Sequence, residues 1–128
     1  MPRKQSAGLT DAELRLMEVL WQKGSATVAE VVQSLAEEVN LAYSTVLTTL
    51  RILENKGHIA HTTDGRTFVY KPITGRDDAR ENAVALLVRR FFQDSPELLV
   101  LSLTEGKKIN PKELARLRKR IASEEEKP

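Results

Sequence analysis

The sequence contains no cysteine and only two histidines, His58 and His61, among its 128 residues. Without thiols there is no disulfide framework, no thiolate metal site and no cysteine nucleophile. The two histidines are three positions apart, where alternation along a strand directs them to opposite faces, and no carboxylate cluster accompanies them. No Ser/His/Asp grouping, phosphate-binding loop or close carboxylate pair stands out. We therefore expect no metal, no cofactor and no enzymatic activity.

Long apolar runs are also missing. No segment approaches the ~18 continuous apolar residues of a membrane span, and the N-terminal stretch MPRKQSAGLT lacks the apolar run of a signal peptide. We expect no membrane insertion and a cytoplasmic location. The composition, 41% hydrophobic and 30% charged, is typical of a globular protein. A chain of this length fits one domain, or one small domain with an appendage.

A strong excess of charge of one sign is absent too. The net charge is +2, and residues 1–74 hold 8 Lys and Arg against 8 Asp and Glu, whereas residues 75–128 hold 12 against 10. Overall charge therefore gives little reason to expect a polyanionic partner. The basic run from Lys107 to Arg120 could contact DNA, but because an acidic tail follows it, a solvated helical face is the preferred interpretation. Any nucleic-acid interface has to be inferred from where individual charges lie.

Two capping boxes mark the first two helices. Thr10 is followed three residues later by Glu13, and Thr27 by Glu30, each pair just before an apolar-periodic segment. The first helix is expected to end at Gly24 and the second near Asn40. The buried stripe of the first helix is expected to contain Leu14, Met17 and Trp21, with Leu16 and Leu20 beside them. The buried stripe of the second helix is expected to contain Val28, Val31, Val32 and Leu35.

A third helix is expected within residues 42–57, AYSTVLTTLRILENKG. Val46, Leu50 and Leu53 share its inner face, and the opposite line is Ser44, Thr48, Arg51 and Asn55. Short hydroxyl side chains allow a helix to enter a major groove, where they bond base edges or phosphates. The alternative is a solvated helix, although such a face usually carries Glu and Lys because Ser and Thr are mediocre helix formers.

Residues 58–72 change to a strand-like period around Asp64-Gly65, which is a strong hairpin signal. Arg66 follows this turn, at the hairpin tip, where a basic residue can reach a phosphate or the minor groove. Three helices and a hairpin, with a short turn between the second and third helices, are typical of a winged helix-turn-helix. A three-helix bundle followed by a hairpin that has no part in DNA binding would give a similar sequence pattern. We assign residues 1–74 to this DNA-binding domain.

Residues 75–128 are predicted to form a helical dimerisation domain. A helix is expected after TGRDDAR, a break at Ser95-Pro96, a further Leu-rich helix, and a last helix capped by Asn110 with Pro111 at its first position. The apolar residues cover more circumference than one peripheral helix buries alone, which favours an isologous dimer. The alternative is that these helices pack back on the first domain. The expected dimerisation residues are Val84, Leu87, Val88, Phe91, Leu98 and Leu101.

Three blocks of the sequence, LTDAELRLMEVLW, TVLTTLRILENKG and DGRTFVYKP, followed by the helical segment, resemble the family of penicillinase and methicillin-resistance repressors. This resemblance covers nearly the whole chain. It implies a winged-helix domain, a helical dimerisation domain and repression from inverted-repeat operators. The family's recognition-helix positions fall on Tyr43, Ser44, Thr45 and Thr48, and its wing arginine on Arg66. Tyr43-Ser44 stands where penicillinase repressors have Pro-Lys, so the base preference at that end is expected to differ.

Two further implications concern regulation. The copper-responsive relatives carry a C-terminal cysteine motif, which this chain lacks. The antibiotic-responsive relatives are inactivated by proteolysis at an Asn-Phe bond, through a membrane sensor protease system. The aligned dipeptide here is Ser102-Leu103, so cleavage at that bond is a hypothesis.

The sequence thus predicts a mostly α protein with a small β hairpin, acting as a homodimeric repressor on a double-stranded DNA operator. Ser44, Thr45, Thr48 and Arg51 are expected near the bases. Two alternatives remain at this point. One is a winged-helix module that binds protein, which the neutral first half favours. The other is a DNA-binding sensor with a small ligand between its helical domains.

Overall fold

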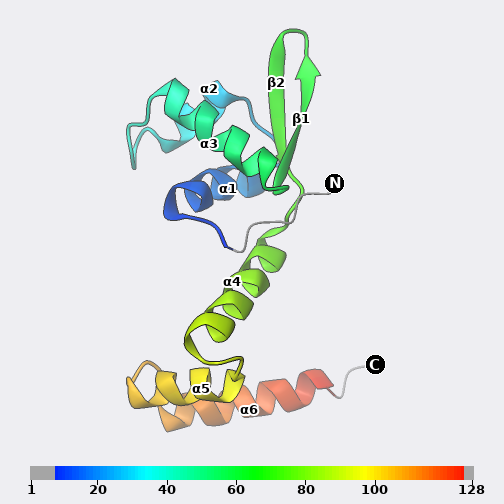
Figure 1. Ribbon diagram of the computed structural model, residues 1–128. Helices are drawn as coiled ribbons and strands as arrows, with labels where there is room; N and C mark the ends of the chain where they lie inside the picture. Colours follow the sequence, from blue (N-terminus) through cyan, green and yellow to red (C-terminus); the bar gives the residue numbers. More distant parts are fainter. Residues whose placement is uncertain (1–7, 126–128) are drawn as a thin grey trace. The chain divides into compact units, whose positions relative to one another are not determined.

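The computed structural model describes residues 8–125. In that range the chain forms six helices and one two-stranded antiparallel sheet, which confirms the predicted mostly α fold with a small hairpin (Figure 1). The elements follow in the order α1 (Asp11–Lys23), α2 (Val28–Leu35), α3 (Tyr43–Asn55), β1 (Ile59–Asp64), β2 (Thr67–Pro72), α4 (Arg76–Phe91), α5 (Pro96–Glu105) and α6 (Pro111–Glu125).

Local capping fixes where most helices begin. The hydroxyls of Thr10 and Thr27 accept from the backbone N–H groups of Glu13 and Glu30, whose carboxylates accept in return from the two cap residues. Both predicted capping boxes are therefore confirmed. The same reciprocal pair forms between Asn110 and Glu113 at the start of α6. Because the two residues of each capping box are only three positions apart, the boxes can be predicted from the sequence.

Two helix ends differ from expectation. The second helix stops at Leu35 instead of near Asn40, and its continuation carries Glu37 and Glu38, whose charges are unfavourable at a helix C-terminus. The fourth helix already begins at Arg76, and Asp77 and Asp78 lie in its first turn. Carboxylates there interact favourably with the positive end of the helix dipole, so the segment expected to precede the helix belongs to it.

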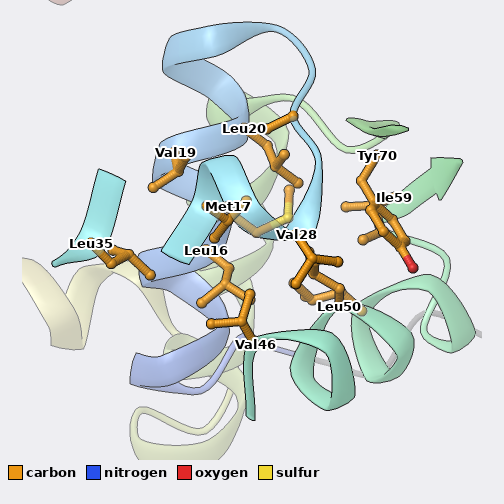
Figure 2. Packing of buried hydrophobic residues seen from close by; sticks show 13 residues of the cluster. Leu16, Met17, Val19, Leu20, Val28, Leu35, Val46, Leu50, Ile59 and Tyr70 are labelled. Atoms are coloured by element: carbon orange, nitrogen blue, oxygen red, sulfur yellow. The ribbon is translucent and has the colours of Figure 1, made fainter. Parts of the chain in front are cut away.

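A single buried cluster joins the first three helices to the hairpin. Leu16, Met17 and Leu20 of α1 meet residues from α2, α3 and both strands, as Figure 2 shows. The predicted inner line of α3 is confirmed: Val46, Leu50 and Leu53 are completely buried. Leu14 and Trp21, in contrast, do not join this buried cluster fully. Leu14 is exposed and Trp21 half-buried, because α1 turns Leu16, Met17, Val19 and Leu20 towards α2 and α3.

The hairpin is fixed to the helices through backbone hydrogen bonds. β1 pairs with β2 from Ile59↔Pro72 to Asp64↔Thr67, and Gly65 at the tip has φ = 65°, a conformation that glycine adopts without strain. On the other side of β2, Ala26 and Tyr70 exchange two N–H···O bonds of 2.9 and 2.8 Å. The loop between α1 and α2 is thereby joined to β2 by one isolated antiparallel bridge, which holds the base of the hairpin.

The chain divides into two compact units, the first extending to Leu86 and the second starting at Leu87. This division lies within α4, whereas the sequence suggested a functional boundary after residue 74. Within the second unit, α5 begins after the predicted break at Ser95-Pro96: the Ser95 hydroxyl accepts from the N–H of Leu98, and Pro96 occupies the first turn. Among residues 8–125, no helix is both long and apolar enough to span a membrane.

Candidate nucleic-acid interface

The outer face of α3 carries the residues expected to contact DNA. Tyr43, Ser44, Thr45, Thr48 and Arg51 are all exposed, and Tyr43 exposes 56% of its surface. This exposure follows from the helical period, since Val46, Leu50 and Leu53 hold the opposite face in the core. The structure brings these five residues onto the solvent side of one helix.

The hydroxyls of this helix are not equivalent. Thr49 is half-buried, and its Oγ1 donates to the carbonyl of Thr45 at 2.9 Å. This bond keeps the Thr49 hydroxyl within its own helix. Thr48, one position earlier, points away from the core and stays exposed. Thr48 therefore offers both a hydroxyl and a methyl group to a groove.

The N-terminus of α3 has no side-chain cap. Its cap residue is Ala42, whose methyl group cannot accept a hydrogen bond, whereas Thr10, Thr27, Ser95 and Asn110 cap other helices. The first N–H groups of a helix need an acceptor, and a phosphate oxygen is a good one because the helix dipole favours negative charge there. The sequence at this helix start is thus suited to a DNA backbone contact.

A contact between α3 and the hairpin sets the position of the wing, β1–β2 with its tip at Asp64–Thr67. Nδ1 of His61 on β1 lies 2.6 Å from Oε2 of Glu54 near the end of α3. The His61 ring also stacks on Phe68 of β2, with centroids 4.1 Å apart and planes 13° from parallel. His61 was not expected to have a role, because its partner Glu54 lies seven residues away and on another element.

Arg51 on α3 and Arg66 at the tip of the wing are both exposed. Neither guanidinium forms an ion pair with a carboxylate within the described part of the chain. Each can therefore approach a phosphate or a guanine edge without first losing an internal partner. Figure 1 shows the wing extending beyond the three-helix layer of this unit, so the surfaces of α3 and of the wing tip are both accessible.

Behind α3, a charged pair connects the end of this helix to the start of α1. Nζ of Lys56 lies 2.8 Å from the carboxylate of Glu13, whose side chain is 5% exposed. Burial of Glu13 acts to raise its pKa, but the hydrogen bonds from Lys56 and Thr10 outweigh it and lower the pKa. The carboxylate therefore stays ionised while it serves both the cap and the lysine. Sequence reasoning identified the cap and missed the lysine, which is 43 residues away.

The base of the wing is attached to α1 by a further set of contacts. Nε1 of Trp21 donates to the carbonyl of Thr74 at 2.9 Å, and the guanidinium of Arg76 lies 5.4 Å from the centre of the Trp21 ring. Arg76 also pairs with Glu18 at 2.9 Å. These contacts tie the residues after β2 to α1. Together with the Ala26–Tyr70 bridge, they hold the wing from both sides of its base.

In the second unit, Leu87 and Phe91 at the end of α4 and Leu98 and Leu101 on α5 are exposed. Phe91 exposes 72% of its surface, a large apolar area to leave in water. Val88, expected beside them, is buried within its own chain at 9% exposure. Val84, the remaining residue of this set, belongs to the first unit and is also exposed.

The dipeptide Ser102-Leu103, which the sequence suggested as a possible cleavage site, lies in α5, and both residues are exposed. The carbonyl of Ser102 accepts from the N–H of Gly106 at 2.9 Å, and that of Leu103 from the N–H of Lys108 at 2.9 Å. A protease binds its substrate in an extended form. Cleavage at this bond would therefore require local unwinding of the last turn of α5.

Comparison with known proteins agrees with this architecture. The profile of the penicillinase repressor family matches residues 9–123. The penicillinase repressor of Bacillus licheniformis is 30% identical over 114 residues, covering 89% of each chain. A solution structure of the DNA-binding domain of the repressor BlaI is 35% identical, with a TM-score of 0.53, over 59% of this chain and 92% of that one.

A further structure contains DNA: monomeric BlaI of B. licheniformis in complex with the blaP half-operator. It is 34% identical to this chain, with a TM-score of 0.50, over 60% of this chain and 93% of that one. The family profile spans both the helix–hairpin unit and the C-terminal helices, so the match is not confined to the widespread winged-helix part. The chain belongs to the penicillinase repressor family.

Proposed function

We propose that this protein is a transcriptional repressor that binds an inverted-repeat DNA operator as a homodimer. Its membership of the penicillinase repressor family supports DNA-binding repression. The BlaI structure with a half-operator supports the use of one winged-helix unit per half-site. The observation that carries the proposal is the exposed small-residue face of α3, Ser44, Thr45 and Thr48, on a helix whose N-terminus has no cap.

In the proposed complex, α3 enters the major groove. Ser44, Thr45, Thr48 and Arg51 face base edges, Tyr43 lies at the entering end, and Arg66 on the wing contacts the backbone or the minor groove. The residues of the first unit up to 74 supply DNA binding, and residues 75–128 supply dimerisation. Because residues 1–74 carry no net charge, specificity depends on base contacts more than on general attraction. Binding would take place in the cytoplasm.

The dimerisation proposal rests on the exposed apolar side chains of α4 and α5. Large apolar surfaces are seldom left in water, and a two-fold pairing covers the same stripe on both copies. A two-fold dimer also matches an inverted repeat, with half-sites separated by whole turns of DNA. The exposed residues that support it are Val84, Leu87, Phe91, Leu98 and Leu101.

Selection of bound sequences from random double-stranded DNA tests the repressor proposal. The expected result is an enriched palindrome whose half-sites are one or two helical turns apart. Enrichment of a single half-site would contradict the dimer while retaining DNA binding. No enrichment at all would contradict the proposal and favour a winged-helix module that binds protein.

Inactivation by a membrane sensor protease at Ser102-Leu103 is a separate part of the proposal. It rests on the resemblance to the antibiotic-responsive repressors and on the exposure of both residues. The chain should be incubated with its cognate activated sensor protease and its intact mass measured. Two fragments that meet at this bond are expected, and Leu103→Pro should remove them. A chain that stays whole would exclude this mode of induction.

A further inference from the structure

Ile52, on the outer side of α3, is a large apolar residue that the expected DNA-contacting set did not include. It exposes 42% of its surface, so it belongs neither to the buried cluster nor to the half-buried residues that pack against it. Leu47 of the same helix, in contrast, is half-buried and packs against that cluster. A β-branched residue is also a weaker helix former than Leu, Glu or Lys at an exposed position. Neither the core nor helix stability therefore accounts for an isoleucine here.

The helical period places Ile52 in line with two of the residues proposed to face bases. Thr45, Thr48 and Ile52 are at positions i, i+3 and i+7, which form one row along an α-helix. All three side chains are exposed, and the buried face of α3 lies on the other side of the helix. At a rise of about 1.5 Å per residue the row is about 10 Å long, comparable to roughly three base-pair steps. Ile52 thus extends the proposed DNA-contacting face by one turn.

The chemistry along this row favours one kind of base. Thr48 precedes Ile52 by four residues, so the two side chains are neighbours and the Thr48 methyl group extends the apolar surface. The only acidic residue of α3, Glu54, lies beside His61 of the wing. In a major groove, the apolar feature of a base edge is the C5-methyl group of thymine. Any other base would set a hydrogen-bonding atom against the carbon atoms of Ile52, where it finds no partner.

We propose that Ile52 is a specificity-determining residue that contacts the C5-methyl group of a thymine in each operator half-site. This inference rests on the proposed function, because it requires α3 to enter the major groove. The contact removes the thymine methyl group and the exposed surface of Ile52 from water. Burial of one methyl group corresponds to a gain of about 3- to 5-fold in affinity.

Replacing thymine with deoxyuridine tests the contact, because it removes only the methyl group and leaves base pairing intact. Each thymine of one half-site of the selected operator is replaced in turn, and the affinity of the full-length protein is measured by fluorescence anisotropy. At one or more positions the wild type should lose about 3- to 5-fold in affinity and Ile52→Ala should lose nothing. At all other thymines the two proteins should respond alike. Ile73→Ala, the same substitution at an exposed isoleucine outside α3, should respond as the wild type does throughout.

The outcomes separate this inference from the proposed function. If Ile52→Ala and the wild type lose the same affinity at every replaced thymine, Ile52 contacts no thymine methyl group, and the inference is wrong although the protein binds its operator. An affinity loss in Ile52→Ala that is equal on all these operators would likewise overturn it, because the residue would then act only through the fold. If the wild type selects no DNA sequence at all, the proposed function and this inference are both wrong.

Discussion

Nδ1 of His61 lies 2.6 Å from Oε2 of Glu54, and this contact joins the end of the helix proposed to read DNA to the first strand of the wing. If this contact couples α3 to the wing, the changes in the free energy of unfolding caused by removing each of its two side chains should not be additive. We predict a coupling free energy of about 1 kcal/mol in a double-mutant cycle of Glu54→Ala and His61→Ala. Urea unfolding followed by the fluorescence of Trp21, the only tryptophan, measures it. Additive effects would mean that the contact contributes nothing.

The pair formed by Lys56 and Glu13 should stabilise the first unit more than a surface ion pair does. Glu13 is buried and also completes the cap of α1, so removing Lys56 leaves a carboxylate without its main partner. We predict that Lys56→Met lowers the free energy of unfolding by roughly 1–3 kcal/mol. Lys71→Met, at an exposed position on β2 without an ion pair among residues 8–125, serves as the control and should change it by less than about 0.5 kcal/mol. Equal effects of the two variants would refute the role of the buried pair.

The burial of His58 predicts a pH dependence of stability. Burial lowers its pKa in the folded state below the ordinary value of 6.5, so the unfolded chain binds a proton more readily. The free energy of unfolding should therefore fall as the pH drops below about 6.5 and continue to fall until the folded-state pKa is reached. Urea titrations between pH 7.5 and pH 5, roughly the range in which a histidine titrates, measure this slope. His58→Asn should flatten it; an unchanged slope in that variant would assign the effect to other groups.

Phe91 gives the most direct test of self-association. It is largely exposed in the single chain, and it belongs to the proposed dimer interface. Phe91→Glu would bury a charge in that interface. At a micromolar protein concentration, sedimentation equilibrium should then find a monomer where the wild type is a dimer. Gln93→Glu adds the same charge two residues further on and should leave the dimer intact. A wild-type chain that is already monomeric at this concentration would contradict the proposal.

Much of the fold follows from signals that are close together in the sequence. The Thr10–Glu13 and Thr27–Glu30 boxes and the Asp64-Gly65 turn are each complete within four residues, and all formed as predicted. The inner line of α3 could be predicted because the helical period alone determines it. Such signals specify where elements begin and which face is buried, and these are the features that place the hydroxyl face of α3 in solvent.

The remaining features depend on contacts between distant residues. The partners of Glu13 and Trp21 lie 43 and 53 residues away, and no local pattern identifies them. The orientation of α1 was misjudged for the same reason, since the apolar side chain of Leu14 suits the buried core as well as the lining of a cavity outside it. His58 was dismissed as a possible metal ligand, whereas its burial and unpaired Nε2 become apparent only when α1, α4 and the hairpin are assembled.

The central claim is that the hydroxyl face of α3 reads the operator, and one substitution tests it most directly. Operator binding by Thr48→Glu should be measured by fluorescence anisotropy on the sequence obtained by selection, with Gln22→Glu, on the exposed surface of α1, as a control of equal charge. The account predicts that Thr48→Glu loses roughly 100-fold or more in affinity, because a carboxylate enters the groove beside the phosphates. It should remain dimeric, and Gln22→Glu should bind nearly as the wild type does. Unchanged affinity of Thr48→Glu would contradict the assignment of α3 as the recognition helix.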